Sequence, residues 1–82
     1  MHSPFPDLVP LIVLGRNAAS SGQLRELRLA LGLTVCDLAR VTGANPSSVS
    51  RWERNITRPD VEHACRLGEV VSGMVAAEIA TR

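Results

Sequence analysis

Apolar residues recur at helical spacing along most of the chain after residue 20. Leu24, Leu27 and Leu31 follow the i, i+3, i+7 pattern that lines one face of a helix. We predict that this helix begins at Ser20, because Gln23 three residues later completes a capping-box pattern. The glycine that follows Leu31 is suited to end the helix in a left-handed turn.

Two short helices joined by a tight turn are predicted next. The first starts from Thr34, a favourable N-cap, and ends before Gly43. The second is capped by Asn45, opens on Pro46, which needs no backbone donor at that position, and runs to about Arg54. Such a pair can place a polar helix in the major groove of DNA while the preceding helix braces it.

The second helix of this pair is two-sided. Val49 and Trp52, three residues apart, lie on one side and are predicted to face the core. The other side carries Pro46, Ser47, Ser50, Arg51 and Arg54. Arg51 has the length and geometry to form a bidentate pair with guanine, a contact worth about 1–3 kcal/mol of discrimination between bases.

A further helix is predicted to open at Pro59. Its apolar face comprises Val61, Ala64, Cys65, Leu67, Gly68 and Val71. Residues 73–82 are a C-terminal tail, for which a short fifth helix is the alternative; Gly73 interrupts its continuity. The predicted fold is therefore a compact all-α bundle of four to five helices, with its helix-turn-helix domain over residues 20–72.

Residues 1–19 are predicted to form an N-terminal apolar arm and a linker, because three prolines interrupt them and small polar residues follow. The apolar run Leu8–Leu14 fits either a short helix that starts near Asp7 or an extended strand, since periodicity does not decide at this length.

Charge is unevenly distributed along the chain. The net charge is only +1, but four arginines and a single acid, Glu53, lie between Arg40 and Arg58. Positive charge is thus concentrated on the two helices and the segment after them, as expected for the electrostatic footprint of a DNA-binding surface.

Other classes of function are disfavoured. The two cysteines are isolated, so no metal site or other cofactor is implied. The serines have no neighbouring histidine, and 82 residues leave little room for a substrate pocket, so we expect no enzyme activity. The longest apolar run is too short to span a bilayer and lacks the features of a signal peptide, so we expect a cytoplasmic protein that is not bound to membranes.

From about Leu24 to Val71 the chain resembles the Cro/repressor-type (XRE-like) helix-turn-helix family, which has a lambda-repressor-like fold. The matching residues, in register, are Leu27-Arg28, Gly32-Leu33-Thr34, Leu38-Ala39, Gly43, Val49-Ser50-Arg51-Trp52-Glu53 and Pro59. The resemblance implies that Ala39 packs against Val49 where the helices cross and that Arg28 pairs with Glu53. It also implies DNA contacts at Thr34, Asn45, Pro46, Ser47, Ser48, Ser50, Arg51, Arg54 and Arg58.

The chain departs from the family pattern at three places. Val35 stands where many relatives carry a glutamine that grips a phosphate, and Asn55 replaces a common glycine. Pro46 and Ser47 occupy positions often filled by long polar side chains. Fewer hydrogen bonds to bases follow, so sequence preference is expected to depend on Arg51 and on DNA shape.

The leading hypothesis is a sequence-specific regulator of transcription, a small phage or prokaryotic repressor of the Cro type that binds double-stranded DNA as a homodimer. Residues 73–82 with the preceding helix are the favoured self-contact, and the N-terminal arm is the second choice. The alternative is an antitoxin-like protein-interaction module that binds a protein partner through residues 4–14.

Overall fold

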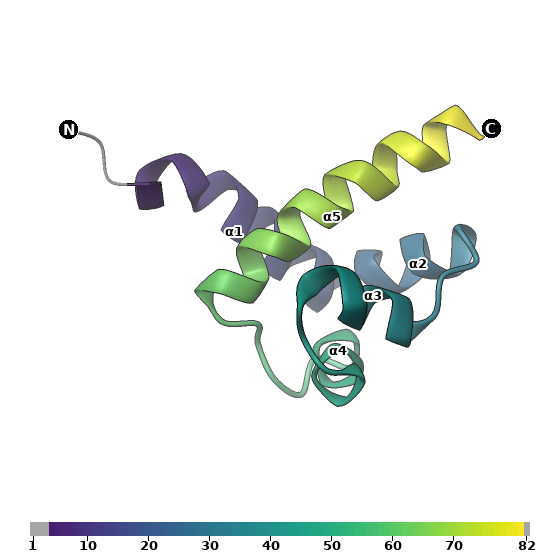
Figure 1. The fold of residues 1–82 in the computed structure, drawn as a ribbon, viewed down its shortest axis with the longest axis horizontal. Coiled ribbons are helices and arrows are strands. Elements are labelled where there is room, and N and C mark those ends of the chain that lie inside the picture. Colours follow the sequence, from purple (N-terminus) through teal and green to yellow (C-terminus); the bar gives the residue numbers. More distant parts are fainter. Residues whose placement is uncertain (1–3, 82) are drawn as a thin grey trace.

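A computed structural model of the chain describes residues 4–81, and these residues form an all-helical bundle (Figure 1). The helices of this described part are α1 (Pro4–Ser21), α2 (Gln23–Ala30), α3 (Val35–Thr42), α4 (Pro46–Glu53) and α5 (Val61–Ala80). The three short helices α2 to α4 lie on one side of the long α5 (Figure 1). The prediction of an all-α fold with a helix-turn-helix is confirmed.

Most of the segment that was expected to be an arm and a linker is helical, since residues 4–19 belong to α1; residues 1–3 of that prediction lie outside the described residues. α1 includes Pro10 in its interior and packs along α5. Two further prolines, at positions 4 and 6, lie in its first turn, where backbone N–H groups have no partner within the helix. Of the two conformations compatible with Leu8–Leu14, the chain adopts the helical one, because this helix has a neighbour to pack against.

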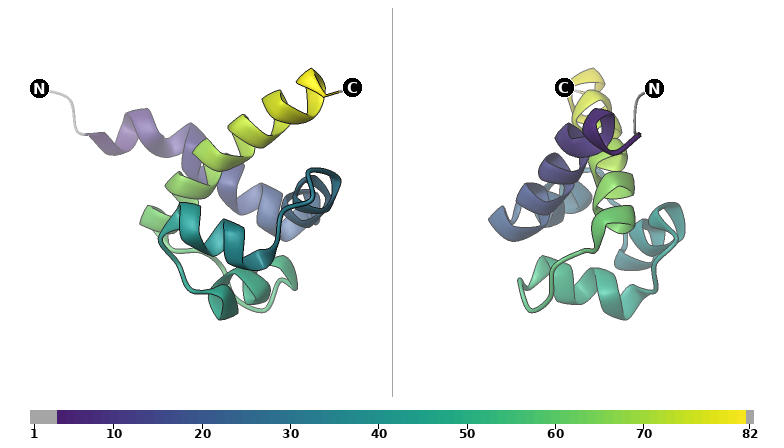
Figure 2. Two further views of the ribbon diagram at one scale, coloured as in Figure 1. Left: turned by 45° about the vertical axis from the view of Figure 1, so that its right-hand side comes forward. Right: turned by 90° about the vertical axis from the view of Figure 1, so that its left-hand side faces the viewer.

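α1 and α5 cross with their backbones in direct contact. A Cβ atom on Gly68 would collide with the carbonyl oxygen of Leu11 and lie 2.7 Å from its carbonyl carbon. A Cβ on Gly15 would likewise collide with the carbonyl oxygen of Ala64 and lie 2.9 Å from the nitrogen of Gly68. Beyond this crossing the two helices diverge, so that the start of α1 and the end of α5 point away from each other (Figure 2).

The start of α2 also differs from the prediction. The N-cap is Gly22, in the left-handed conformation with φ 86°, and it makes no side-chain cap bond. The predicted pairing of Ser20 with Gln23 is therefore wrong; the Ser21 hydroxyl instead accepts a hydrogen bond from the Gln23 N–H at 3.3 Å. The cause is that Ser20 belongs to the last turn of α1, so the chain reverses only at Gly22.

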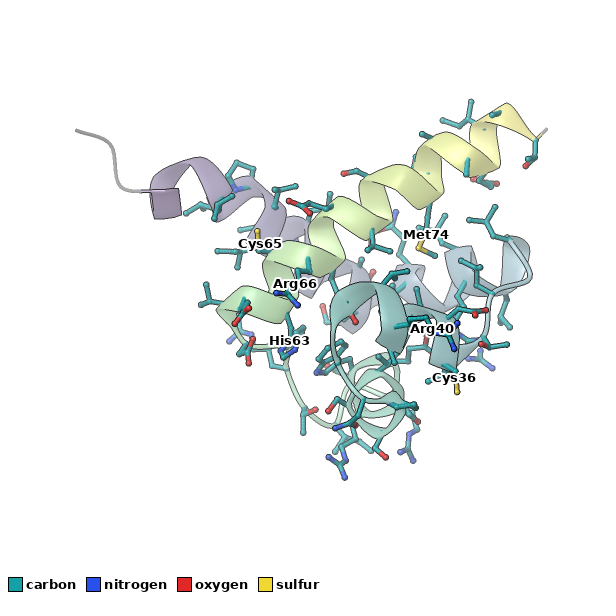
Figure 3. All side chains as sticks on the ribbon, viewed as in Figure 1. Cys36, Arg40, His63, Cys65, Arg66 and Met74 are labelled. Atoms are coloured by element: carbon teal, nitrogen blue, oxygen red, sulfur yellow. The ribbon has the colours of Figure 1, made fainter. Side chains whose placement is uncertain are left out.

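The core consists mainly of aliphatic side chains, together with the indole ring of Trp52. Its buried residues are Ala18, Ala19, Leu24, Leu27, Leu38, Ala39, Val49, Trp52, Leu67, Val71 and Met74. Met74 points from α5 toward the short helices (Figure 3). Because this side chain is 5% exposed and its neighbours continue the same helix to Ala80, the segment expected as a separate tail is the outer part of α5. Gly73 lies within that helix and faces solvent.

Arg28 and Glu53 form the ion pair that the family resemblance implied. Arg28 Nε and Nη2 donate to the two carboxylate oxygens of Glu53 at 2.7 and 2.9 Å, and Nη1 donates to the Leu33 carbonyl at 3.1 Å. The side chains are 12% and 5% exposed. Hydrogen bonding to Glu53 raises the pKa of Arg28. The pair fixes α4 against α2, and thus sets the orientation of the exposed face of α4.

The glycine crossing can be tested by two alanine substitutions in one helix. Gly68→Ala is expected to lower the free energy of unfolding by about 1–3 kcal/mol, because the added methyl group forces the α1 backbone away. Gly73→Ala adds the same methyl group where nothing lies within 4 Å. It should therefore raise stability by about 0.5–1 kcal/mol. Urea denaturation followed by circular dichroism measures both; equal effects would contradict the crossing.

Because Arg28 and Glu53 form a buried ion pair, substitutions of the two residues are expected to change the free energy of unfolding non-additively. Arg28→Leu should destabilise by about 2–3 kcal/mol, because it leaves the Glu53 carboxylate buried without its partner. Adding Glu53→Leu should recover most of that loss, since no buried charge then remains. A double variant as unstable as the sum of the single ones, in the same denaturation experiment, would show that the two groups act independently.

Candidate nucleic-acid interface

α3 and α4 are joined by a turn that local residues determine. Gly43 ends α3 in the left-handed conformation with φ 74°, and the N–H of Ala44 donates to the Ala39 carbonyl at 3.0 Å. Asn45 then caps α4, its side-chain oxygen accepting from the Ser48 N–H at 2.9 Å. Pro46 occupies the first position of α4, where no backbone donor is needed.

The inner faces of these two helices belong to the core. Ala39 and Val49 are 3% and 0% exposed, and both lie in the same cluster of buried residues as Trp52. The small alanine side chain lets the helices approach closely. Arg66 of α5 adds a contact from above, donating to the Thr42 carbonyl at 3.2 Å (Figure 3). Packing in the core and this contact with α5 therefore fix the α3–α4 pair within the bundle.

The outer face of α4 borders a shallow hollow of about 430 Å³. It is lined by Val35, Pro46, Ser47, Ser50, Arg51 and Arg54. Pro46, Ser47 and the two arginines are exposed, whereas Ser50 is half-buried. Cys36, the neighbour of Val35, lies on the same lower side of the molecule as α4 (Figure 3). The structure thus brings together, on one surface, most of the residues that the sequence singled out on α4.

The electrostatics of this surface are more positive than the residue count suggests. Arg40, Arg51, Arg54 and Arg58 are all exposed. The one acid of this stretch, Glu53, instead faces inward and is neutralised by Arg28. The exposed arginine charge of this segment is therefore not offset by Glu53, while the Asp37 carboxylate of α3 interacts electrostatically with Arg40.

Thr34 takes part in a capping box at the start of α3. Its hydroxyl oxygen accepts from the Asp37 N–H at 3.0 Å, and its own N–H donates to the Asp37 carboxylate at 2.8 Å. These hydrogen bonds lower the pKa of Asp37. The family resemblance implies a DNA contact at Thr34. Because the backbone N–H of Thr34 already donates to Asp37, the donor that this residue retains is its hydroxyl proton.

The segment between α4 and α5 carries Arg58 and lies against Arg16 of α1, a residue that no sequence motif singles out. Asn55 adopts the left-handed conformation at φ 58°, as its replacement of a family glycine requires. Arg16 of α1 donates through Nε to the Pro59 carbonyl at 3.2 Å. A hollow of about 340 Å³ lies between this segment and α1, with Arg16 and Arg58 among its lining residues. Only the packing of α1, not a sequence motif, reveals this neighbour.

The start of α5 is fixed by Asp60. Its carboxylate accepts from the His63 N–H at 2.9 Å and lies 3.0 Å from Nδ1 of the same residue. The backbone hydrogen bond is the main cause that lowers the pKa of Asp60. The His63 ring lies 5.6 Å from that of Trp52, so it continues the core and does not belong to the polar face of α4.

Neither a cluster of metal-ligating side chains nor a candidate membrane-spanning helix is present within residues 4–81. No three His, Cys, Asp or Glu side chains of these residues are grouped so that they could hold a metal ion. None of the described helices combines the length and the apolar character that crossing a membrane requires.

A protein-family model described as helix-turn-helix matches residues 24–70, more than half of the chain. No curated protein and no solved structure matches the chain significantly. The matched segment starts within α2 and ends within α5, so it contains the α3–turn–α4 unit and the whole outer face of α4. Sequence match, fold and surface agree: the chain belongs to the XRE-type family of helix-turn-helix DNA-binding regulators.

Proposed function

We propose that the protein is a sequence-specific repressor of the Cro type that inserts α4 into the major groove of double-stranded DNA. The observation that supports this most directly is the outer face of α4: its first two turns present small polar side chains and Arg51 to solvent. The start of a recognition helix is the part that reaches base edges. Repression would follow from occupying a promoter.

Arg51 is the proposed direct reader of sequence. It is exposed, and it borders the same hollow as Ser47 and Ser50, whose short side chains leave room for a base pair to approach. A guanidinium group can donate two parallel hydrogen bonds to guanine O6 and N7. The two serines can add single hydrogen bonds to either base type.

The proposed phosphate contacts flank this reader. Thr34 contributes its hydroxyl proton at the start of α3, and Asn45 contributes its side-chain N–H₂ because only its oxygen is used in the cap. Arg54 and Arg58 contribute exposed guanidinium groups. Such contacts fix the position of the protein on the duplex but carry no sequence information. Ser48 lies between these groups, half-buried in the first turn of α4.

We further propose that the protein acts as a two-fold dimer. One recognition helix contacts only a few base pairs, too few to define a genomic site when each mismatch costs about 1–3 kcal/mol. Two copies would read half-sites about one helical turn apart. The favoured self-contact is the outer part of α5, which projects from the bundle and carries Ile79 at 59% exposure. Met74 and Val75 contribute less than the sequence suggested, because they pack within the chain.

The second candidate is a protein-interaction module. α1 exposes Val9 and Val13, each 49% accessible, within the segment 4–14. An open hollow of about 610 Å³ lies between Leu8 and α5. Exposed apolar residues at helical spacing fit a partner that buries them. This candidate does not use the arginines of the α4 surface.

Substitution of single arginines distinguishes base reading from phosphate binding. Arg51→Ala should relax the preferred sequence at one base-pair position, whereas Arg54→Ala and Arg58→Ala should weaken all sequences alike and flatten the salt dependence. Arg25→Ala, an exposed arginine of α2, is the matched control. Selection of bound sequences from a random DNA pool measures the preference. An unchanged motif with Arg51→Ala would exclude direct readout, and no DNA binding by the wild type at about 50 mM salt would favour the interaction module.

The dimer is tested by two matched charge substitutions. Ile79→Glu should shift the sedimentation coefficient at micromolar concentration from dimer to monomer, because it places a carboxylate in the proposed interface. Val13→Glu, on the exposed side of α1, should leave the dimer intact. The reverse result would assign the interface to α1. A wild-type protein that stays monomeric even on palindromic DNA would end the dimer proposal.

A further inference from the structure

We propose that Val35 and Pro46 together form a receptor for the 5-methyl group of a pyrimidine in the major groove. This inference rests on the proposed function and deepens it, because it assigns a specificity-determining role to a residue outside the recognition helix. Val35 is the first residue of α3 and Pro46 the first of α4, yet both line the hollow that also contains Arg51.

The apolar part of this hollow is small and held in place. Val35 is half-buried and packs against the core, so its position is fixed while part of its surface faces outward. The preceding residue is fixed by the Thr34–Asp37 capping box. Pro46 is exposed and is held by the Asn45 cap and its own ring. The receptor is therefore preorganised, and little conformational entropy is lost when it is filled.

The chemistry of the major groove determines what fits it. Purine edges and the exocyclic groups of cytosine and thymine present hydrogen-bond donors and acceptors there, and the 5-methyl group of thymine is the apolar feature. Val35 and Pro46 side chains offer no hydrogen bond, so a purine edge pressed against them would lose its hydration without compensation. A methyl group instead loses only unfavourable contact with water. Thymine and 5-methylcytosine carry the same group in the same place.

The surrounding residues leave space for such a contact. Ser47 and Ser50 are short, so the hollow of about 430 Å³ stays open between the two helix starts. Val41 shows the contrast within α3: it is 60% exposed but does not line this hollow. An exposed valine is thus not by itself a receptor; the pairing of Val35 with a second apolar side chain is the feature that carries the proposal.

Deoxyuridine scanning tests the proposal with the wild-type protein. In the DNA site obtained by selection, each thymine is replaced in turn by deoxyuridine, which removes the methyl group and leaves base pairing unchanged. We expect one thymine per half-site at which binding weakens about four-fold, the effect of burying a single methyl group. At that position, 5-methylcytosine paired with guanine should bind more tightly than unmethylated cytosine; equal binding of the two would contradict a receptor for the methyl group.

Two variants assign the effect to the receptor. In Val35→Ser and in Pro46→Ser the affinities for thymine and uracil at that position should become equal, whereas Val41→Ser should keep the four-fold difference. Circular dichroism checks folding, and the second variant remains informative if the first is unstable. Tight binding that is unaffected by uracil at every position would overturn this inference but not the proposed function. A uracil effect that persists in both variants would also overturn it, and no binding to any duplex at low salt would overturn the proposed function as well.

Discussion

The contact of the α1 backbone with the α5 backbone at Gly15 and Gly68 is the constraint on which the rest of the bundle depends. Only glycine allows this approach, because a Cβ atom at either position would overlap the backbone of the other helix. With α1 against one side of α5, the other side is free to carry Leu67, Val71 and Met74 into the core shared with the short helices. α5 therefore serves as the common support for α1 and for the DNA-binding unit.

The candidate interface is held in place by buried side chains and by helix caps, not by contacts among its own exposed side chains. Arg28 and Glu53 hold the end of α4, Asn45 holds its start, and Arg66 ties the end of α3 to α5. The exposed arginines are thereby carried on a fixed platform, which limits the entropy lost when DNA binds. The same arrangement removes the negative charge of Glu53 from the surface that would meet phosphates.

The helix-turn-helix unit could be predicted from the sequence because its signals are local. Thr34, Gly43, Asn45 and Pro46 each determine a cap or a turn within a few residues, and the buried faces of the short helices follow their apolar spacing. α1 could not be predicted with the same rules. Its prolines, considered without the rest of the chain, indicate an interrupted helix. Its helical form depends on packing against Gly68, more than fifty positions after Gly15 in the chain. The hollow beside Arg51 is likewise non-local, since Val35 and Pro46 belong to different helices.

The participation of α1 in the core changes what counts as the foldable unit. The family match begins at residue 24, but Ala18 and Ala19, which precede it, are 0% and 3% exposed and belong to the central cluster. A fragment trimmed to the matched segment would expose that part of the core to solvent. It would also expose the surface of α5 around Gly68 that α1 covers. The core of this helix-turn-helix unit therefore extends beyond its family signature, toward the N-terminus into α1.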